Sequence, residues 1–146
     1  MTATREQDSQ LPAATRRAYR KARYRVFTEP PLTLRVGEPN ARLARVHRQY
    51  GVTCSAFVTA CNPRGEMGTD GENHARQQAL AVNLDQKGHA RLTGIGEDPA
   101  GEWPGEANFL ILGMNREEAA DLGAQWGQNA VVWAGADATP ELIFLR

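Results

Sequence analysis

The sequence has no long apolar run. No stretch approaches the roughly 18 apolar residues that a membrane-spanning helix needs, and the polar N-terminus lacks the apolar centre of a secretory signal peptide. We therefore expect no membrane partner and a cytoplasmic location.

Cysteine and histidine are scarce, at two and three residues. Cys54 and Cys61 fall on one predicted strand, where their separation would place the Cα atoms roughly 23 Å apart. A disulfide requires about 7 Å or less, so we expect buried free thiols, which fit a reducing compartment. The histidines show no ligand spacing with each other or with the cysteines, so we expect no metal site, and we predict no cofactor.

Motifs of known chemistry are also missing. The sequence contains no P-loop, no GxGxxG after a strand, no GxSxG, no HExxH and no CxxC. These absences exclude the corresponding nucleotide-binding, hydrolase and metalloprotease signatures. Whether the protein is an enzyme is left open.

Charge is balanced overall but unevenly distributed. Residues 1–50 carry a balance of +7, and residues 97–146 carry −7. The two ends can neutralise each other within one fold or across a homodimer. Alternatively, a basic face binds an anionic partner, for which Arg16, Arg17, Arg20 and Lys21 are the candidate contacts to nucleic acid.

The chain length of 146 residues is typical of one domain. Residues 1–11 are polar and aperiodic and are predicted to be a disordered tail, which leaves 12–146 as a single globular domain. Strands are predicted over 24–28, 32–37, 53–61, 90–95, 108–114, 129–135 and 140–146. Helices are predicted over 12–22, 41–50, 70–87 and 116–126, with Asn40 as the N-cap of the second helix.

From Thr53 the predicted order is strand, helix, strand, strand, helix, strand. This is the order of a ferredoxin-like split βαβ core, so the fold class is α/β (α+β). An N-terminal helix, a hairpin and a further helix precede the core, and one extra strand follows it. In this topology Asn62–Arg76, Trp103–Glu106 and Gly127–Asn129 meet at one end of the sheet, which predicts a pocket there.

One face of the helix over 70–87 combines polar and apolar residues. Asn73, Arg76, Leu80 and Leu84 share that face by their spacing. The leucines are expected to pack on the sheet, which turns Asn73 and Arg76 inward near the helix N-terminus. A partly buried Arg76 needs Glu72, Glu106 or a bound anion as its partner. A purely structural alternative assigns these groups to helix capping, strand termination and an ion pair.

The same segments resemble a known family. The stretches TACNPR, ENHAR with a leucine four residues later, GIGEDPAGEWPGE, FLILGM and WGQNAVVW are similar to the bacterial family called domain of unknown function 3293, from about Ala18 to Leu145. Two departures are Ala107, where the family has serine, and Cys61, where it has an aromatic residue. The resemblance implies no activity. It implies six motif residues: Asn62, Glu72, Asn73, Arg76, Glu106 and Gln128.

Three functions fit these observations. The first is a binding module in which these six residues hold a small polar or anionic ligand. The second is a hydrolase or transferase with Glu72 and Glu106 as acid and base and Arg76 stabilising negative charge. The third is a nucleic-acid or protein adaptor that uses the basic N-terminal segment, although no platform of aromatic and basic residues is evident in the sequence.

Overall fold

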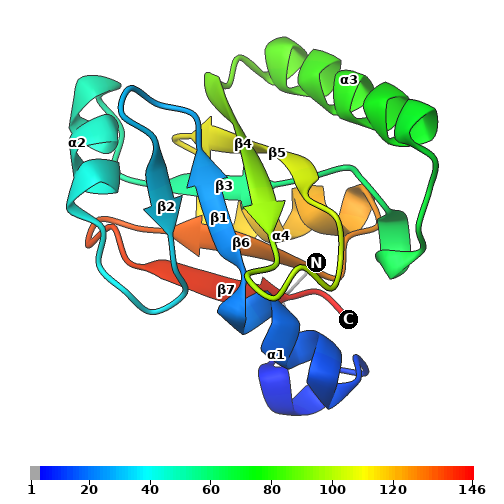
Figure 1. The fold of residues 1–146 in the computed structure, drawn as a ribbon. Coiled ribbons are helices and arrows are strands. Elements are labelled where there is room, and N and C mark those ends of the chain that lie inside the picture. Colours follow the sequence, from blue (N-terminus) through cyan, green and yellow to red (C-terminus); the bar gives the residue numbers. More distant parts are fainter. Residues whose placement is uncertain (1–3) are drawn as a thin grey trace.

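The computed structural model describes residues 4–146 (Figure 1). Its α-helices are α1 (Ala13–Lys21), α2 (Ala41–Gln49), α3 (Asp70–Lys87) and α4 (Arg116–Gln125). Its strands are β1 (Arg23–Val26), β2 (Leu32–Leu34), β3 (Ser55–Val58), β4 (Arg91–Glu97), β5 (Glu106–Leu112), β6 (Ala130–Ala134) and β7 (Pro140–Phe144). Two short 3-10 helices, η1 (Glu6–Asp8) and η2 (Pro63–Gly65), complete the described part of the chain.

All seven strands belong to one curled sheet, in the order β2-β1-β4-β5-β3-β6-β7. Every neighbouring pair is antiparallel. The predicted mixture of helices and strands is therefore confirmed. Strand β5 lies between β3 and β4. Because β3 and β5 are antiparallel, the end of β3 and the start of β5 are at the same end of the sheet.

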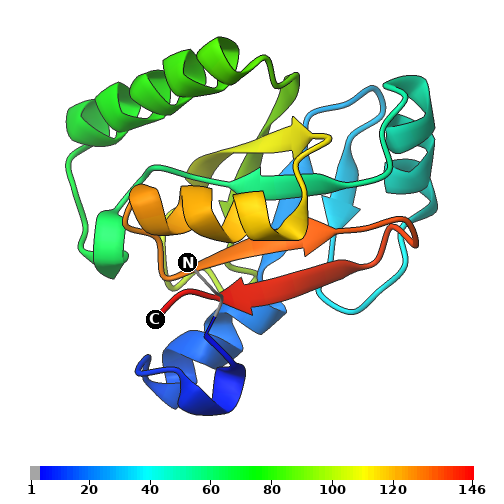
Figure 2. The same ribbon diagram turned by 180° about the vertical axis from the view of Figure 1, so that it is seen from behind.

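The two faces of the sheet bury two different apolar clusters. Phe57 and Leu110 pack with Leu43 and Val46 of α2 on one face. The residues next to Phe57 and Leu110 along the same strands point to the other face of the sheet. There they pack with Leu80 and Leu84 of α3 and with Ala119 and Leu122 of α4. Figure 2 shows α4 against β3 and β6, and α1 lies at one end of the molecule with side chains that are at most half-buried.

The helix boundaries follow from local capping. Asn40 accepts a hydrogen bond from the Leu43 amide, which confirms it as the N-cap of α2. Thr69 and Glu72 form a reciprocal capping box at the start of α3, and Gly88 ends that helix with φ 75°. Asn115 and Glu118 form the same box on α4.

Several strands differ from their predicted bounds. The strand predicted over 53–61 is too long, because the hydrogen bonds to the neighbouring strands end at Val58. Beyond it a side chain takes their place: Gln77 Oε1 accepts from the Ala60 amide at 3.0 Å. Conversely, β5 begins at Glu106, two residues before the predicted start, because Glu106 still pairs with Gly96 on β4. This early start holds the Glu106 backbone in the sheet.

The N-terminal segment lies beside the last strand. Thr4 forms a bridge with Phe144, and Ser9 Oγ donates to the Arg146 carbonyl oxygen at 2.6 Å. The disordered tail predicted for 1–11 stays a prediction; residues 1–3 lie outside the described residues.

Both cysteines are free, as predicted. Only Cys61 is buried, whereas Cys54 is half-buried, and neither lies within β3, so their predicted placement on one strand was wrong. No helix in residues 4–146 combines the length and the apolar character needed to cross a bilayer. Arg25 on β1 and Glu97 on β4 form an ion pair at 3.3 Å, which joins the basic and the acidic part of the chain.

Candidate functional site

Asn62 organises the connection between β3 and α3. Its backbone is left-handed, with φ 46° and ψ 58°, a conformation that asparagine adopts more readily than residues without a short polar side chain. The Asn62 amide donates to Asn73 Oδ1 at 2.9 Å, and Asn62 Oδ1 accepts from the Gly68 amide and from Asn73 Nδ2 at 2.9 and 2.8 Å. These bonds tie the segment 62–68 to the first turns of α3.

The remaining donor of Asn62 reaches β5. Asn62 Nδ2 donates to Glu106 Oε2 at 2.6 Å, across 44 residues of sequence. Burial raises the pKa of Glu106, and the bond from Asn62 partly opposes this shift by favouring the carboxylate. Glu106 Oε1 accepts no hydrogen bond from residues 4–146, so half of this partly buried carboxyl group is unused.

Three cavities meet at Asn62 and Glu106, which line all of them. We call the first the α1 cavity, of about 310 Å³, because α1 forms one wall. The second is the α3 cavity, of about 260 Å³, beside the start of α3. The third is the inner cavity, of about 60 Å³, inside the curled sheet. The unused oxygen therefore belongs to a residue at the junction of all three spaces.

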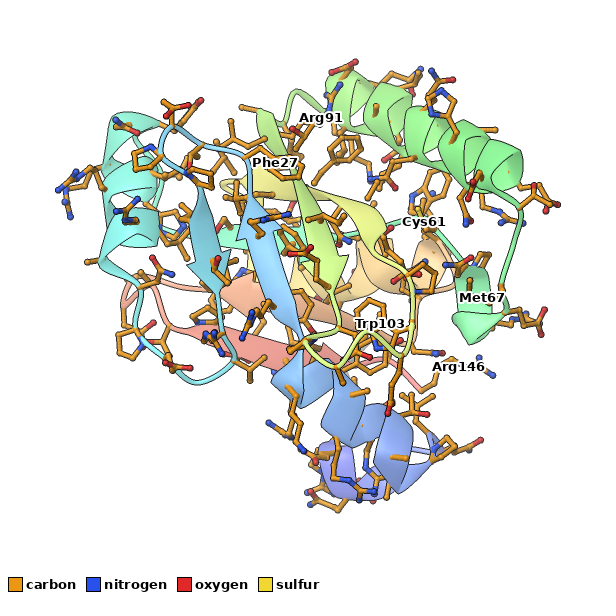
Figure 3. The ribbon with its side chains drawn as sticks, in the orientation of Figure 1. Phe27, Cys61, Met67, Arg91, Trp103 and Arg146 are labelled. Carbon is orange, nitrogen blue, oxygen red and sulfur yellow. The ribbon has the colours of Figure 1, made fainter. Side chains whose placement is uncertain are left out.

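The α1 cavity is mainly apolar. Ala14, Ala18 and Tyr19 contribute from α1, and Met67 and Trp103 from the two loops opposite. Figure 3 shows Trp103 on the loop between β4 and β5 and Met67 beside η2. Such a cavity offers surface for an apolar part of a ligand next to one carboxyl group.

The α3 cavity contains polar groups and one thiol. It is lined by Asn73, His74, Gln77 and Cys61 among others. Gln77 is 8 % exposed, and its Nε2 atom is buried without a hydrogen-bond partner among the described residues. Burial raises the pKa of the Cys61 thiol, which keeps it protonated and unreactive.

The segment 127–128 joins the same end of the sheet. Gln128 is buried and donates from Nε2 to the Cys61 carbonyl oxygen at 3.0 Å, and it lines the inner cavity. The Gly127 carbonyl oxygen accepts from the Arg64 amide at 2.7 Å. A Cβ atom on Gly127 would lie 2.9 Å from the Pro63 side chain, so this close approach requires glycine. The predicted convergence of the three segments is thus observed.

Glu72 and Arg76 lie beside this junction and do not line its cavities. Glu72 is exposed, and its carboxylate accepts from the Thr69 amide at 2.9 Å in the capping box, which lowers the pKa of Glu72. Arg76 Nη1 donates to Asn73 Oδ1 at 3.2 Å. The expected ion pair of Arg76 with Glu72 or Glu106 is absent from the described residues, because Asn73 takes the guanidinium and Asn62 takes Glu106.

Several residues of the site were missed in the sequence. Gln77 precedes Leu80 by three positions and Leu84 by seven, and this helical spacing could have identified it. Tyr19 has no such signal: only the tertiary structure brings α1 to Glu106. Burial raises the pKa of Tyr19, an effect that a hydrogen bond with Asn129 opposes and the Glu106 charge increases.

The arrangement can accept a hydrogen bond in a partly desolvated space. Residues 4–146 contain no group of three or more histidine, cysteine, aspartate and glutamate side chains that could hold a metal ion. The polar side chains that line the three cavities include the Glu106 and Asp70 carboxyl groups, several amides, the His74 imidazole, the Cys61 thiol and the Tyr19 phenol.

Comparison with known families gives one match. Residues 58–131 match the family described as a protein of unknown function (DUF3293), and they extend from the last residue of β3 to the start of β6. No curated protein and no solved structure matches the chain significantly. Because the match covers half of the sequence, the chain belongs to this family.

Proposed function

We propose that this member of the DUF3293 family is a binding domain for a small polar molecule whose hydroxyl or ammonium group donates to Glu106. One observation carries the proposal: Glu106 Oε1 has no partner among the described residues, although Glu106 lines three adjoining cavities. This oxygen is accessible from the cavities, because it is not among the buried side-chain atoms that lack a partner, so a donor on a ligand can reach it.

The surroundings of Glu106 favour a donor over an anion as the ligand group. The nearest fixed polar contact is the neutral Asn62 amide, and Arg76 is held by Asn73 outside the cavities. An anion in the α1 cavity would lie against a carboxyl group without a neighbouring cation to offset it. Within the predicted class of polar or anionic ligands, the neutral or cationic polar molecules are therefore the better candidates.

The walls suggest the shape of the ligand. Its apolar part would pack in the α1 cavity between Ala18, Met67 and Trp103. A polar part would extend past Glu106 into the α3 cavity, where Asn73 and His74 offer polar groups. The combined volume suits a molecule of metabolite size.

The test is a thermal-shift screen with hydroxylated and amine-bearing metabolites. A ligand at 100 times its Kd adds about 2.7 kcal/mol of stability, which raises the Tm by roughly 5–11 °C in a chain of this size. Glu106→Gln should weaken the shift strongly. Glu102→Gln is the matched control, because Glu102 lies in the loop that precedes β5, is exposed and lines none of the three cavities. An equal shift in the wild type and Glu106→Gln would reject Glu106 as the recognition group.

The catalytic alternative stays a prediction. It needs Glu72, Glu106 and Arg76 around one substrate, and no observation on Glu72 or Arg76 favours it over their roles in capping and in binding Asn73. The adaptor alternative also stays a prediction. One of its four candidate cations, Arg20, is paired with Glu6, and Arg16 donates to the neutral Leu11 carbonyl oxygen.

We also infer that β3, α3, β4, β5, α4 and β6 form a ferredoxin-like split βαβ core. The strand order β4-β5-β3-β6 and the antiparallel pairing support this inference, because a split βαβ unit leaves room for one antiparallel strand between its two parallel ones. A cytoplasmic location is supported by the two free cysteines, which suit a reducing compartment.

A further inference from the structure

A second recessed surface lies between α2 and the β1–β2 hairpin. Its cavity, which we call the α2 groove, measures about 520 Å³. It shares no lining residue with the three cavities around Glu106. What it binds is therefore a separate question from the ligand proposed above.

Two exposed aromatic rings line the α2 groove. Phe27 follows β1 and is 51 % exposed, and Tyr50 ends α2 and is 48 % exposed. Figure 3 shows Phe27 between α2 and β4. The Arg25 guanidinium lies 5.6 Å from the centre of the Phe27 ring. Rings left this open beside a cavity are suited to stacking with a flat, polarisable partner.

The groove is also cationic. Arg42 and Arg45 line it from α2, and neither forms an ion pair among the described residues. Among residues 4–146, the one hydrogen bond of the Arg42 side chain is to the Pro31 carbonyl oxygen at 3.5 Å. Glu29 is the one carboxylate in the lining, so it offsets only part of the charge. The first turn of α2, from which Arg42 extends, contains no acidic residue.

We propose that the α2 groove binds a nucleobase with its phosphate, the base stacked on Phe27 or Tyr50 and the phosphate against Arg42 and Arg45. Aromatic rings beside unpaired arginines are the combination by which proteins hold single-stranded nucleic acid. Free nucleotides offer the same chemistry. The sequence hid this combination, because Phe27 and Tyr50 are separated along the chain and meet only when α2 packs on the hairpin.

The experiment measures fluorescence anisotropy of a labelled oligothymidylate of about ten nucleotides, with AMP as an unlabelled competitor. Phe27→Leu and Tyr50→Leu keep apolar volume but remove the ring, and each stacked ring that is lost should weaken binding about 5- to 150-fold. Replacing both Arg42 and Arg45 by glutamine should reduce the slope of log affinity against log salt by roughly 1.4. Competition by AMP at similar concentration assigns the groove to free nucleotides, and competition by oligonucleotides alone assigns it to single strands.

The matched control is the double variant Arg17→Gln and Lys21→Gln, which removes the same charge from α1 outside the groove. Thermal melts of each variant exclude unfolding as the cause of lost binding. Absence of binding of both probes at low salt would overturn the proposal. So would binding that survives all four groove substitutions but is lost in the α1 control, since that result would place the nucleic acid on the N-terminal helix.

Discussion

Replacing Asn62 with alanine is expected to lower the free energy of unfolding by about 3–5 kcal/mol. Asn62 is buried, and its side chain forms three hydrogen bonds, with the Gly68 amide, with Asn73 and with Glu106. Each neutral bond contributes about 1 kcal/mol, and the bond to the carboxyl group contributes about 1.5–3 kcal/mol. Alanine in the left-handed region adds roughly 1–2 kcal/mol. The three bonds share one side chain, so their contributions are not additive, and the expected loss of about 3–5 kcal/mol lies below their sum of roughly 4.5–7 kcal/mol.

A second substitution separates the backbone contribution from the side-chain contribution. Asn62→Gly loses the same three bonds but tolerates φ 46°, so it should be about 1 kcal/mol more stable than Asn62→Ala. Urea unfolding followed by tryptophan fluorescence gives both values. Gln78→Ala is the control, because Gln78 is exposed on α3. A loss below about 1 kcal/mol in Asn62→Ala, or equal losses in the alanine and glycine variants, would refute this account of the junction.

Three further predictions concern its neighbours. The raised pKa of Glu106 means that the folded state binds the proton more tightly than the unfolded state. The wild type should therefore lose stability relative to Glu106→Gln as the pH rises above the ordinary value of 4.5. Urea unfolding across pH 4–8 measures this difference, and a difference that stays constant with pH would contradict the prediction. Arg76→Ala should lower the free energy of unfolding by only about 0.5–1.5 kcal/mol, because the hydrogen bond of Arg76 is to neutral Asn73. A loss of about 3–5 kcal/mol would instead indicate that Arg76 has a buried carboxylate partner. Gly94→Ala should lower the Tm by roughly 4 °C or more and reduce expression. The added Cβ would lie 2.4 Å from the Arg25 carbonyl oxygen on the adjacent strand. An unchanged Tm would show that β1 and β4 can separate to make room for it.

These measurements also separate the two proposed ligand sites. Substitutions at Asn62 and Glu106 perturb the junction of the three cavities and leave the lining of the α2 groove intact. A ligand that is lost with Glu106→Gln but kept with Phe27→Leu belongs to the junction. The opposite pattern assigns it to the groove.

The sequence by itself determined the features that depend on neighbours along the chain. Asn40 as an N-cap and the extent of α3 were predicted correctly, because capping bonds join residues about three positions apart and glycine ends a helix through its own backbone freedom. The order of strands and helices followed from periodicity, and the three segments at one end of the sheet followed from that order. The same local rule explains the role of Glu72, whose spacing from Thr69 suits a capping box.

The tertiary structure alone decided which of these groups meet. The sequence left Glu72, Glu106 and a bound anion as candidate partners of Arg76. In the structure Asn62 donates to the Glu106 carboxyl group and Asn73 accepts from the Arg76 guanidinium, because hydrogen-bond geometry over a few ångströms depends on how the loops fold. Likewise, no pattern in the sequence relates Tyr19 to Glu106, or Phe27 to Tyr50. These residues come together because the sheet is curled and because α1 and α2 pack where they do. Contacts between distant segments are set by the burial of the whole apolar core and not by spacing along the chain.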